Sequence, residues 1–276
     1  MLAEVAVKVV VYSAALMLVG ISAVRSMLLP RIAAADGVEL ALARIAVASW
    51  ALLVVALALR ASAHTAAVFG PADSIAWESL KTIAINSRWG EAWRWQVAVA
   101  GLGLASAIAA RRWRTFQIVS GALSVAMAIA LARSGHAAGS PLRLTLHSVH
   151  IVGGGTWLGA LAVIAWLAAR DRDAREHFLR TFWFVAIAGV SALALTGTWA
   201  ASAYVGTIPN LWTTTYGRVL VVKLGLVIGA AGCGYVNWRS FRSARTSRVA
   251  PALGWELVLA AAIVIVTGVL TELAHP

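Results

Sequence analysis

Apolar segments of about twenty residues recur along the whole chain, and they limit its fold more than any other feature. A transmembrane helix needs ~20 consecutive, predominantly apolar residues to cross the hydrocarbon core of a bilayer. Eight segments meet this requirement: Ala3–Val24, Val38–Leu59, Trp93–Ala110, Thr115–Leu131, Leu142–Ala169, Phe178–Tyr204, Gly217–Trp238 and Ala252–Ala274. The sequence therefore predicts an all-α, polytopic integral membrane protein with eight transmembrane helices.

The composition supports the same class. Of the 276 residues, 61% are hydrophobic and 12% are charged, whereas a soluble domain carries about 25% charged residues. The net charge of +12 does not indicate nucleic-acid binding, because basic loops orient an inner-membrane protein. No Ser/Pro-rich linker or sizeable soluble domain separates the spans, so residues 1–276 are predicted to form a single membrane domain.

The distribution of lysine and arginine predicts the orientation. The loops after spans one, three, five and seven hold thirteen of these residues, and the loops on the opposite side hold eight. Cytoplasmic loops carry the excess of positive charge. We therefore expect a location in the bacterial inner membrane, with odd-numbered loops in the cytoplasm and both termini in the periplasm.

The fifth span, Leu142–Ala169, contains two histidines near its start. Ionisable side chains inside a membrane are costly, so they form a functional hypothesis by default. His147 and His150 are three residues apart, which places them on one helix face, ~7 and ~12 Å below the outer start of the span at 1.5 Å per residue. Further along, Gly155 and Gly159 form a small-xxx-small pattern, which lets a second helix approach closely.

Five of the six histidines fall on the predicted periplasmic side, and only His177 is cytoplasmic. Imidazole is a good ligand for Cu(II), and imidazole with thioether sulfur suits Cu(I). We therefore predict a copper site that contains His136, His147 and His150. Four further candidate ligands lie on the same side: His64 just beyond the outer end of span two, Met127, Glu272 and His275.

Other polar residues inside the spans have simpler explanations. Lys223 lies about six residues inside span seven, from where its side chain can snorkel to the interface. Cys233 and Asn237 share a face of the same span and either mark an inner exit site for Cu(I) or simply pack. Glu256 is expected at the cytoplasmic start of span eight, where the helix dipole favours a carboxylate.

The sequence does not indicate an enzyme. The chain contains no nucleophile motif or Walker sequence, and Gly153–Gly155 lies inside a span rather than after a strand, so it does not cradle phosphate. The alternative to copper transport is a membrane cytochrome. Histidines on facing helices near one membrane surface can supply both axial ligands of a haem b, and His150 opposite His136 or His64 would serve.

Two short segments hint at a duplication. Ser87-Arg88-Trp89-Gly90 precedes span three and Thr214-Thr215-Tyr216-Gly217 precedes span seven, at an offset of 127 residues. Trp113-Arg114-Thr115-Phe116 and Trp238-Arg239-Ser240-Phe241 follow the same two spans, at an offset of 125. This pattern fits a parallel four-plus-four repeat, as in some transporters. The outer loop before span three also contains a predicted surface helix, Asp73–Ser87.

Four segments resemble the copper resistance protein D (CopD/PcoD) membrane family. They lie mainly in the second half of the chain, residues 134–276: Ser134-Gly135-His136-Ala137; His150 followed by Trp157-Leu158-Gly159 and Leu161; Trp212 to Tyr216-Gly217-Arg218 and Lys223 with Asn237 downstream; and Trp89-Gly90 with Trp93. We do not expect a fixed histidine in the family at the position of His147, and the first two spans match no family motif.

The resemblance implies an eight-span inner-membrane protein for periplasmic copper, which takes up copper toward the cytoplasm. It also implies a small periplasmic copper carrier of the CopC type as a partner, beside membrane lipid and the copper ion itself. The motif positions carried over are His136 and His150 as ligands, with five further positions of unstated role: Trp157, Tyr216, Arg218, Lys223 and Asn237.

Overall fold

The computed structural model describes residues 2–31, 36–134, 139–169, 172–242 and 249–274. Within these ranges every regular element is a helix and no strand occurs, which confirms the all-α prediction. The elements are α1 (Leu2–Ala23), η1 (Val24–Leu28), η2 (Leu29–Arg31), α2 (Asp36–Phe69), η3 (Pro71–Asp73), α3 (Trp77–Asn86), α4 (Arg88–Ala109), α5 (Thr115–Ala132), α6 (Pro141–Gly154), η5 (Gly155–Gly159), α7 (Ala160–Ala168), α8 (Arg172–Val205), α9 (Asn210–Thr213), α10 (Thr215–Arg242) and α11 (Val249–Leu270).

Seven of the eight predicted spans correspond to described helical segments that are long and apolar enough to cross a membrane. The fifth is built from α6, η5 and α7 in sequence, as one segment from Pro141 to Ala168. The third predicted span corresponds to α4, a helix of 22 residues. Its first turns carry Arg88, Glu91 and Arg94, so it is less apolar, yet it packs between α2 and α5.

The second span differs from its predicted bounds. The apolar run ends at Leu59, but α2 continues to Phe69, because the following residues are rich in alanine, the best helix former. His64 was predicted to lie beyond the outer end of the span, and this was wrong: it lies on α2 itself. The predicted surface helix in the next loop is confirmed as α3, after the short turn η3.

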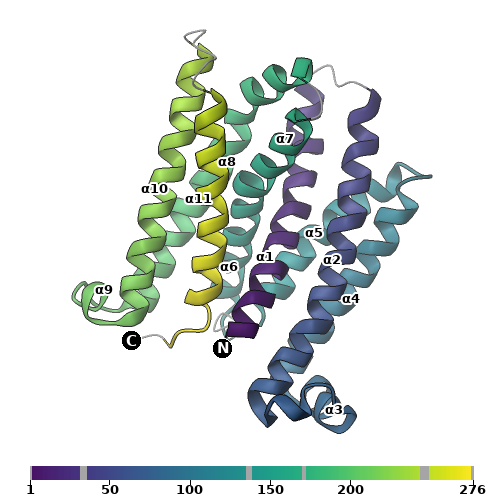
Figure 1. The fold of residues 1–276 in the computed structure, drawn as a ribbon, viewed down its shortest axis with the longest axis vertical. Coiled ribbons are helices and arrows are strands. Elements are labelled where there is room, and N and C mark those ends of the chain that lie inside the picture. Colours follow the sequence, from purple (N-terminus) through teal and green to yellow (C-terminus); the bar gives the residue numbers. More distant parts are fainter. Residues whose placement is uncertain (1, 32–35, 135–138, 170–171, 243–248, 275–276) are drawn as a thin grey trace.

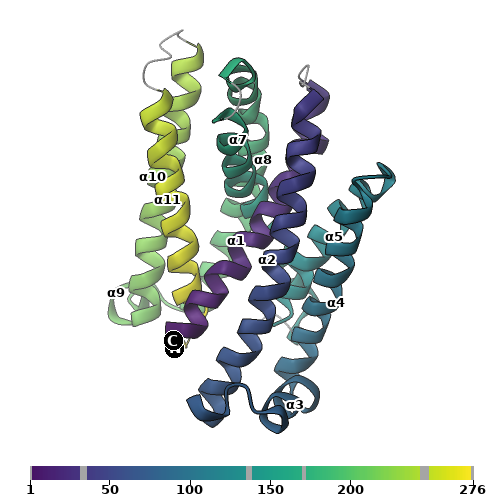
Figure 2. The same ribbon diagram turned by 45° about the vertical axis from the view of Figure 1, so that its right-hand side comes forward.

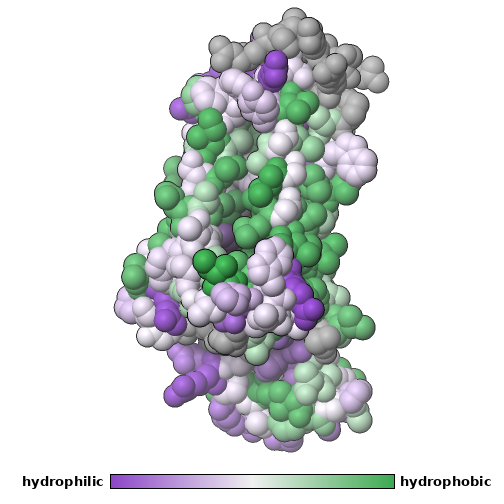
Figure 3. Space-filling model, turned by 90° about the vertical axis from the view of Figure 1, so that its left-hand side faces the viewer, coloured by the Kyte–Doolittle hydropathy of each residue, from purple (hydrophilic) through white to green (hydrophobic). Residues whose placement is uncertain are grey.

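The helices form an elongated bundle with two flanks (Figures 1 and 2). α10 and α11 lie on one flank, α2, α4 and α5 lie on the other, and α1 with α6 and α7 lies between them. We call the end that carries α3 and α9 the outer end. The first turn of α1 and the last turn of α11 are both there. Figure 3 shows a broad hydrophobic band between two more hydrophilic ends.

In the middle of the bundle, α1 crosses η5 at close range. A Cβ atom at Gly159 would overlap the carbonyl oxygen of Leu16, and one at Gly20 would overlap the backbone of Gly159. A Cβ atom at Gly155 would overlap the side chain of Val19. The prediction that Gly155 and Gly159 admit a second helix is therefore confirmed, and that helix is α1.

The hint of duplication has a structural counterpart. The Ser87 hydroxyl accepts the Gly90 amide at 2.8 Å, and the Thr214 hydroxyl accepts the Gly217 amide at 3.0 Å. A Cβ atom at either glycine would overlap the backbone of the short helix before it, α3 or α9. In addition, α1 leads into a π-helical turn, η1, as α6 leads into η5. The third span, α4, and the seventh span, α10, thus begin in the same way, as the four-plus-four repeat predicts.

Substitution of Gly159 by valine tests the central crossing. Because the added side chain would collide with the backbone of α1, we expect Gly159→Val to destabilise the folded protein by about 1–3 kcal/mol, the usual range for overpacking. Thermal unfolding in detergent measures the change. Gly225→Val on α10 is the control, since nothing lies within 4 Å of its added Cβ. Equal melting temperatures for both variants would contradict the importance of the crossing.

Candidate functional site

The predicted copper ligands fall into separate places. His136 and His275 lie outside the described residues, so their roles stay predictions. His147 and His150 lie on α6 and face α8, and His64 lies in a different cavity near Glu4. Among the described residues, no three His, Cys, Asp or Glu side chains are grouped closely enough to hold a metal ion. Met127 is fully buried in the apolar core.

The ring of His150 is held in one orientation. Its Nδ1 lies 2.9 Å from the hydroxyl oxygen of Thr196 on α8. That hydroxyl donates its single hydrogen to the carbonyl oxygen of Ala192 at 2.6 Å, so it accepts from His150. Nδ1 therefore carries the proton, and Nε2 keeps its lone pair. A histidine that ligates a metal almost always donates its other N–H in this way.

His147 lies one turn nearer the outer end. Its Nε2 is 2.9 Å from the hydroxyl oxygen of Tyr204 on α8, and the two rings are tilted against each other at 5.6 Å. Tyr216, the first of the motif positions on α10, packs in the same small cluster as Tyr204. The hydrogen-bond partners of the two histidines are eight residues apart on α8, ~12 Å along the helix axis. Each histidine thus has its own partner on α8.

Three motif positions lie on one face of α10. Tyr216, Lys223 and Asn237 are separated by seven and fourteen residues, a spacing that returns to nearly the same side of a helix. Lys223 is partly buried and interacts electrostatically with His150, as His147 does. Arg218, by contrast, is exposed. The motif therefore places three polar side chains along one side of α10, from the outer end toward the inner end.

Near the inner end, Asn237 of α10 contacts Glu256, an acid whose surroundings were not predicted from the sequence. Glu256 was expected at the start of its span, but α11 begins seven residues earlier, and the side chain is only 2% exposed. Asn237 donates from Nδ2 to Oε2 of Glu256 at 2.9 Å, and Trp157 hydrogen-bonds the same carboxyl group. An acid inside a span was the signal that could have identified it.

A second polar cluster closes the outer end between α1, α2, α4 and the end of α11. His64 Nδ1 lies 3.1 Å from Glu4 Oε1, and the ring stacks on Trp89 at 4.2 Å. Lys8 pairs with Glu272. These side chains surround a cavity of about 180 Å³ together with Arg60 and Ser134. Of the predicted ligands, His64 thus contacts Glu4, and Glu272 is paired with Lys8.

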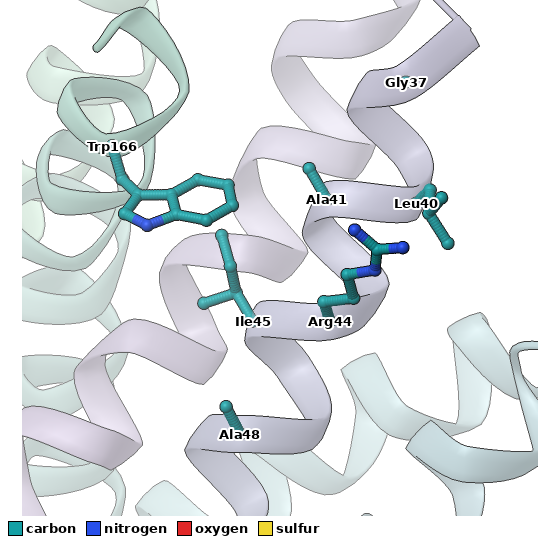
Figure 4. A pocket seen from close by; sticks show the side chains of 7 residues that line it. All are labelled: Gly37, Leu40, Ala41, Arg44, Ile45, Ala48 and Trp166. Carbon is teal, nitrogen blue, oxygen red and sulfur yellow. The ribbon is translucent and has the colours of Figure 1, made fainter. Parts of the chain in front are cut away.

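A groove of about 580 Å³ opens between α2 and α7. Figure 4 shows Arg44 and Trp166 directed toward it, among otherwise small or apolar residues; the lining is Gly37, Leu40, Ala41, Arg44, Ile45, Ala48 and Trp166. None of these side chains is a copper ligand of the imidazole, thiolate or thioether type. The groove is therefore not a candidate metal site.

The protonation pattern of His150 is directly testable. In protein labelled with ¹⁵N-histidine at neutral pH, we expect the His150 resonances of a neutral ring that is protonated on Nδ1 and unprotonated on Nε2. Thr196→Val removes the acceptor for Nδ1–H, so the two tautomers should then mix. Ser202→Ala, which alters an exposed hydroxyl on the same helix, should leave the spectrum unchanged. A proton on Nε2 in the native protein would contradict the assignment.

Comparisons with known proteins identify the family of the chain. Residues 1–144 match the family described as "Copper resistance protein D-like, N-terminal domain", which includes the spans where we recognised no motif, and residues 176–270 match "Copper resistance protein D". The "Copper transport protein CutJ" of Bacillus subtilis (strain 168) is 24% identical over 248 residues, 84% of this chain and 46% of that protein. The chain thus spans about half the length of this relative.

No solved structure matches the chain. The two family matches together cover most of its length, and the helical segments of the structure account for the hydropathy pattern within both. The chain belongs to the copper resistance protein D-like family of membrane proteins.

Proposed function

We propose that this protein carries copper ions across the bacterial inner membrane, from the periplasm toward the cytoplasm, and that His150 receives the ion. The observation that carries the proposal is the hydrogen bond between His150 Nδ1 and the Thr196 hydroxyl, which itself donates to Ala192; this arrangement leaves the lone pair of Nε2 available for a metal ion. Imidazole nitrogen suits copper in either oxidation state. Membership of the copper resistance family and the similarity to a copper transport protein support the choice of metal.

Neighbouring groups complete the proposed entry site. His147 lies one turn further out on α6, and His136 precedes this helix in the chain. In its charged form Lys223, which interacts electrostatically with His150, repels a bound cation and so favours release. A transport site must bind well enough to load and weakly enough to unload.

The orientation in this proposal follows the basic loops. Described arginines that follow the first, third, fifth and seventh spans, such as Arg31 and Arg112, are at the end opposite α3 and α9. With that end in the cytoplasm, both termini and the histidines of α6 face the periplasm. The donor of copper is then a periplasmic carrier of the CopC type, as the sequence resemblance implies.

His150→Ala tests the entry site. Removing the His150 imidazole should reduce the copper affinity of the purified protein at least ~10-fold, because mutating even a residue that only supports a metal ligand costs about this much. Cellular copper accumulation should fall correspondingly. Competition with a chromophoric Cu(I) chelator measures the first, and elemental analysis of cells measures the second. Thr145→Ala, an exposed position on the same helix, is the matched control.

Two outcomes would reject this function. One is unchanged binding and accumulation in a well-folded His150→Ala variant, which would place transport elsewhere. The other is a strong Soret band in the purified native protein that disappears in the same variant, which would assign His150 to haem b ligation instead of copper.

A further inference from the structure

Glu256 is the described acid with the least access to water in the membrane-spanning part of the bundle. It lies seven residues into α11, ~10 Å from the start of that helix. A buried charge is normally paired with an opposite charge, since desolvation otherwise disfavours it strongly. In the part of the chain that the structure describes, no lysine or arginine pairs with Glu256. An ionisable group that is kept in a membrane without a counter-ion calls for a function.

The hydrogen bonds around the carboxyl group suit its ionised form. Asn237 Nδ2 on α10 and the Trp157 indole on η5 both donate to it. The titratable group that faces it from α10 is Cys233, which interacts with it electrostatically. α1 and α7 also pack against α11, and their described residues supply no charged partner. The surroundings therefore offer two donors to a carboxylate but no cation to neutralise it.

Two oxygen atoms at this place are buried and lack a hydrogen-bond partner among the described residues: Oε1 of Glu256 and Oδ1 of Asn237. A buried acceptor that is left unsatisfied costs about 1–3 kcal/mol. A single proton supplies a hydrogen bond that Asn237 Oδ1 lacks, because a protonated carboxyl group donates one hydrogen bond and the Asn237 amide can turn to offer Oδ1 as its acceptor. Gly234 leaves the space for this, since a Cβ there would lie 3.1 Å from Oε1.

We propose that Glu256 is a proton-binding site in the membrane, with Asn237 as the side chain that adapts to both protonation states. A proton from water at the inner end forms an O–H bond at the carboxyl group, and the same bond breaks when the proton returns to water. No electron is transferred. In the ionised state Asn237 donates from Nδ2, and in the protonated state its Oδ1 accepts. The further step, that this proton is exchanged during copper movement, rests on the proposed function.

Infrared difference spectroscopy of the full chain in lipid nanodiscs tests the proton site without copper. Between alkaline and acidic buffer we expect a C=O stretching band of a buried, protonated carboxyl group that shifts in D₂O. The band should be lost in Glu256→Gln and retained in Glu78→Gln, which alters an exposed acid of α3. Asn237→Leu removes a donor to the ionised form, so the midpoint of the titration should move to higher pH by about one unit or more.

A band that persists in Glu256→Gln would overturn the proposal, as would an Asn237→Leu titration identical to that of the native protein. Gel filtration confirms that the variants are folded. Copper binding at His150 is measured separately in Glu256→Gln and should be retained. Failure of copper binding in the native protein would reject the proposed function while the band still reported the proton site.

Copper uptake into proteoliposomes tests the exchange itself. With an imposed pH gradient, uptake by the native protein should change several-fold relative to uptake without one, and Glu256→Gln should lose this dependence. Equal dependence on the gradient in both proteins would overturn the exchange step.

Discussion

The contact on which the rest of the bundle depends is the backbone-to-backbone crossing of α1 with η5. Helices in lipid gain little from burying apolar surface against each other, so close packing of small residues provides much of their attraction. Gly20 and Gly159 lie face to face at this crossing, and neither position has room for a side chain. Because α1 also contacts α2 and α5 on one flank and α11 on the other, this approach joins the fifth span to the helix that touches both flanks.

The two halves begin their third spans alike, yet they use their polar groups differently. In the first half, Arg60 donates to Gln96 at 2.9 Å, and Glu4 and Lys8 are paired with His64 and Glu272. These pairs hold α1, α2, α4 and the end of α11 together, because separating them would leave polar groups unpaired. In the second half, the Nε2 atom of His150 and the Oε1 atom of Glu256 keep bonding capacity. Atoms that keep such bonding capacity are suited to bind a ligand reversibly.

The proposed copper and proton sites lie toward opposite ends of the same interface. His150 is in the outer half of the fifth span and Glu256 is near the inner end of the last, and α10 reaches the first with Lys223 and the second with Asn237. Motion of α10 and α11 relative to α6 and η5 would therefore act on both sites at once. α10 makes few contacts with α8 compared with its extensive packing on α11, so these two helices form a natural unit for such motion.

The sequence by itself determined the class of the protein, most of the spans, the close approach at Gly155 and Gly159, and the placement of His147 and His150 on one helix. These features depend on local composition and on spacing along one helix, both of which are visible in the chain. The tertiary structure alone decided that α1 is the helix that approaches, that Thr196 fixes the His150 ring, and that Trp157 and Asn237 converge on Glu256. These pairs depend on how each helix is rotated and tilted against its neighbours. Packing between helices sets those angles, and no periodicity within a single helix records them.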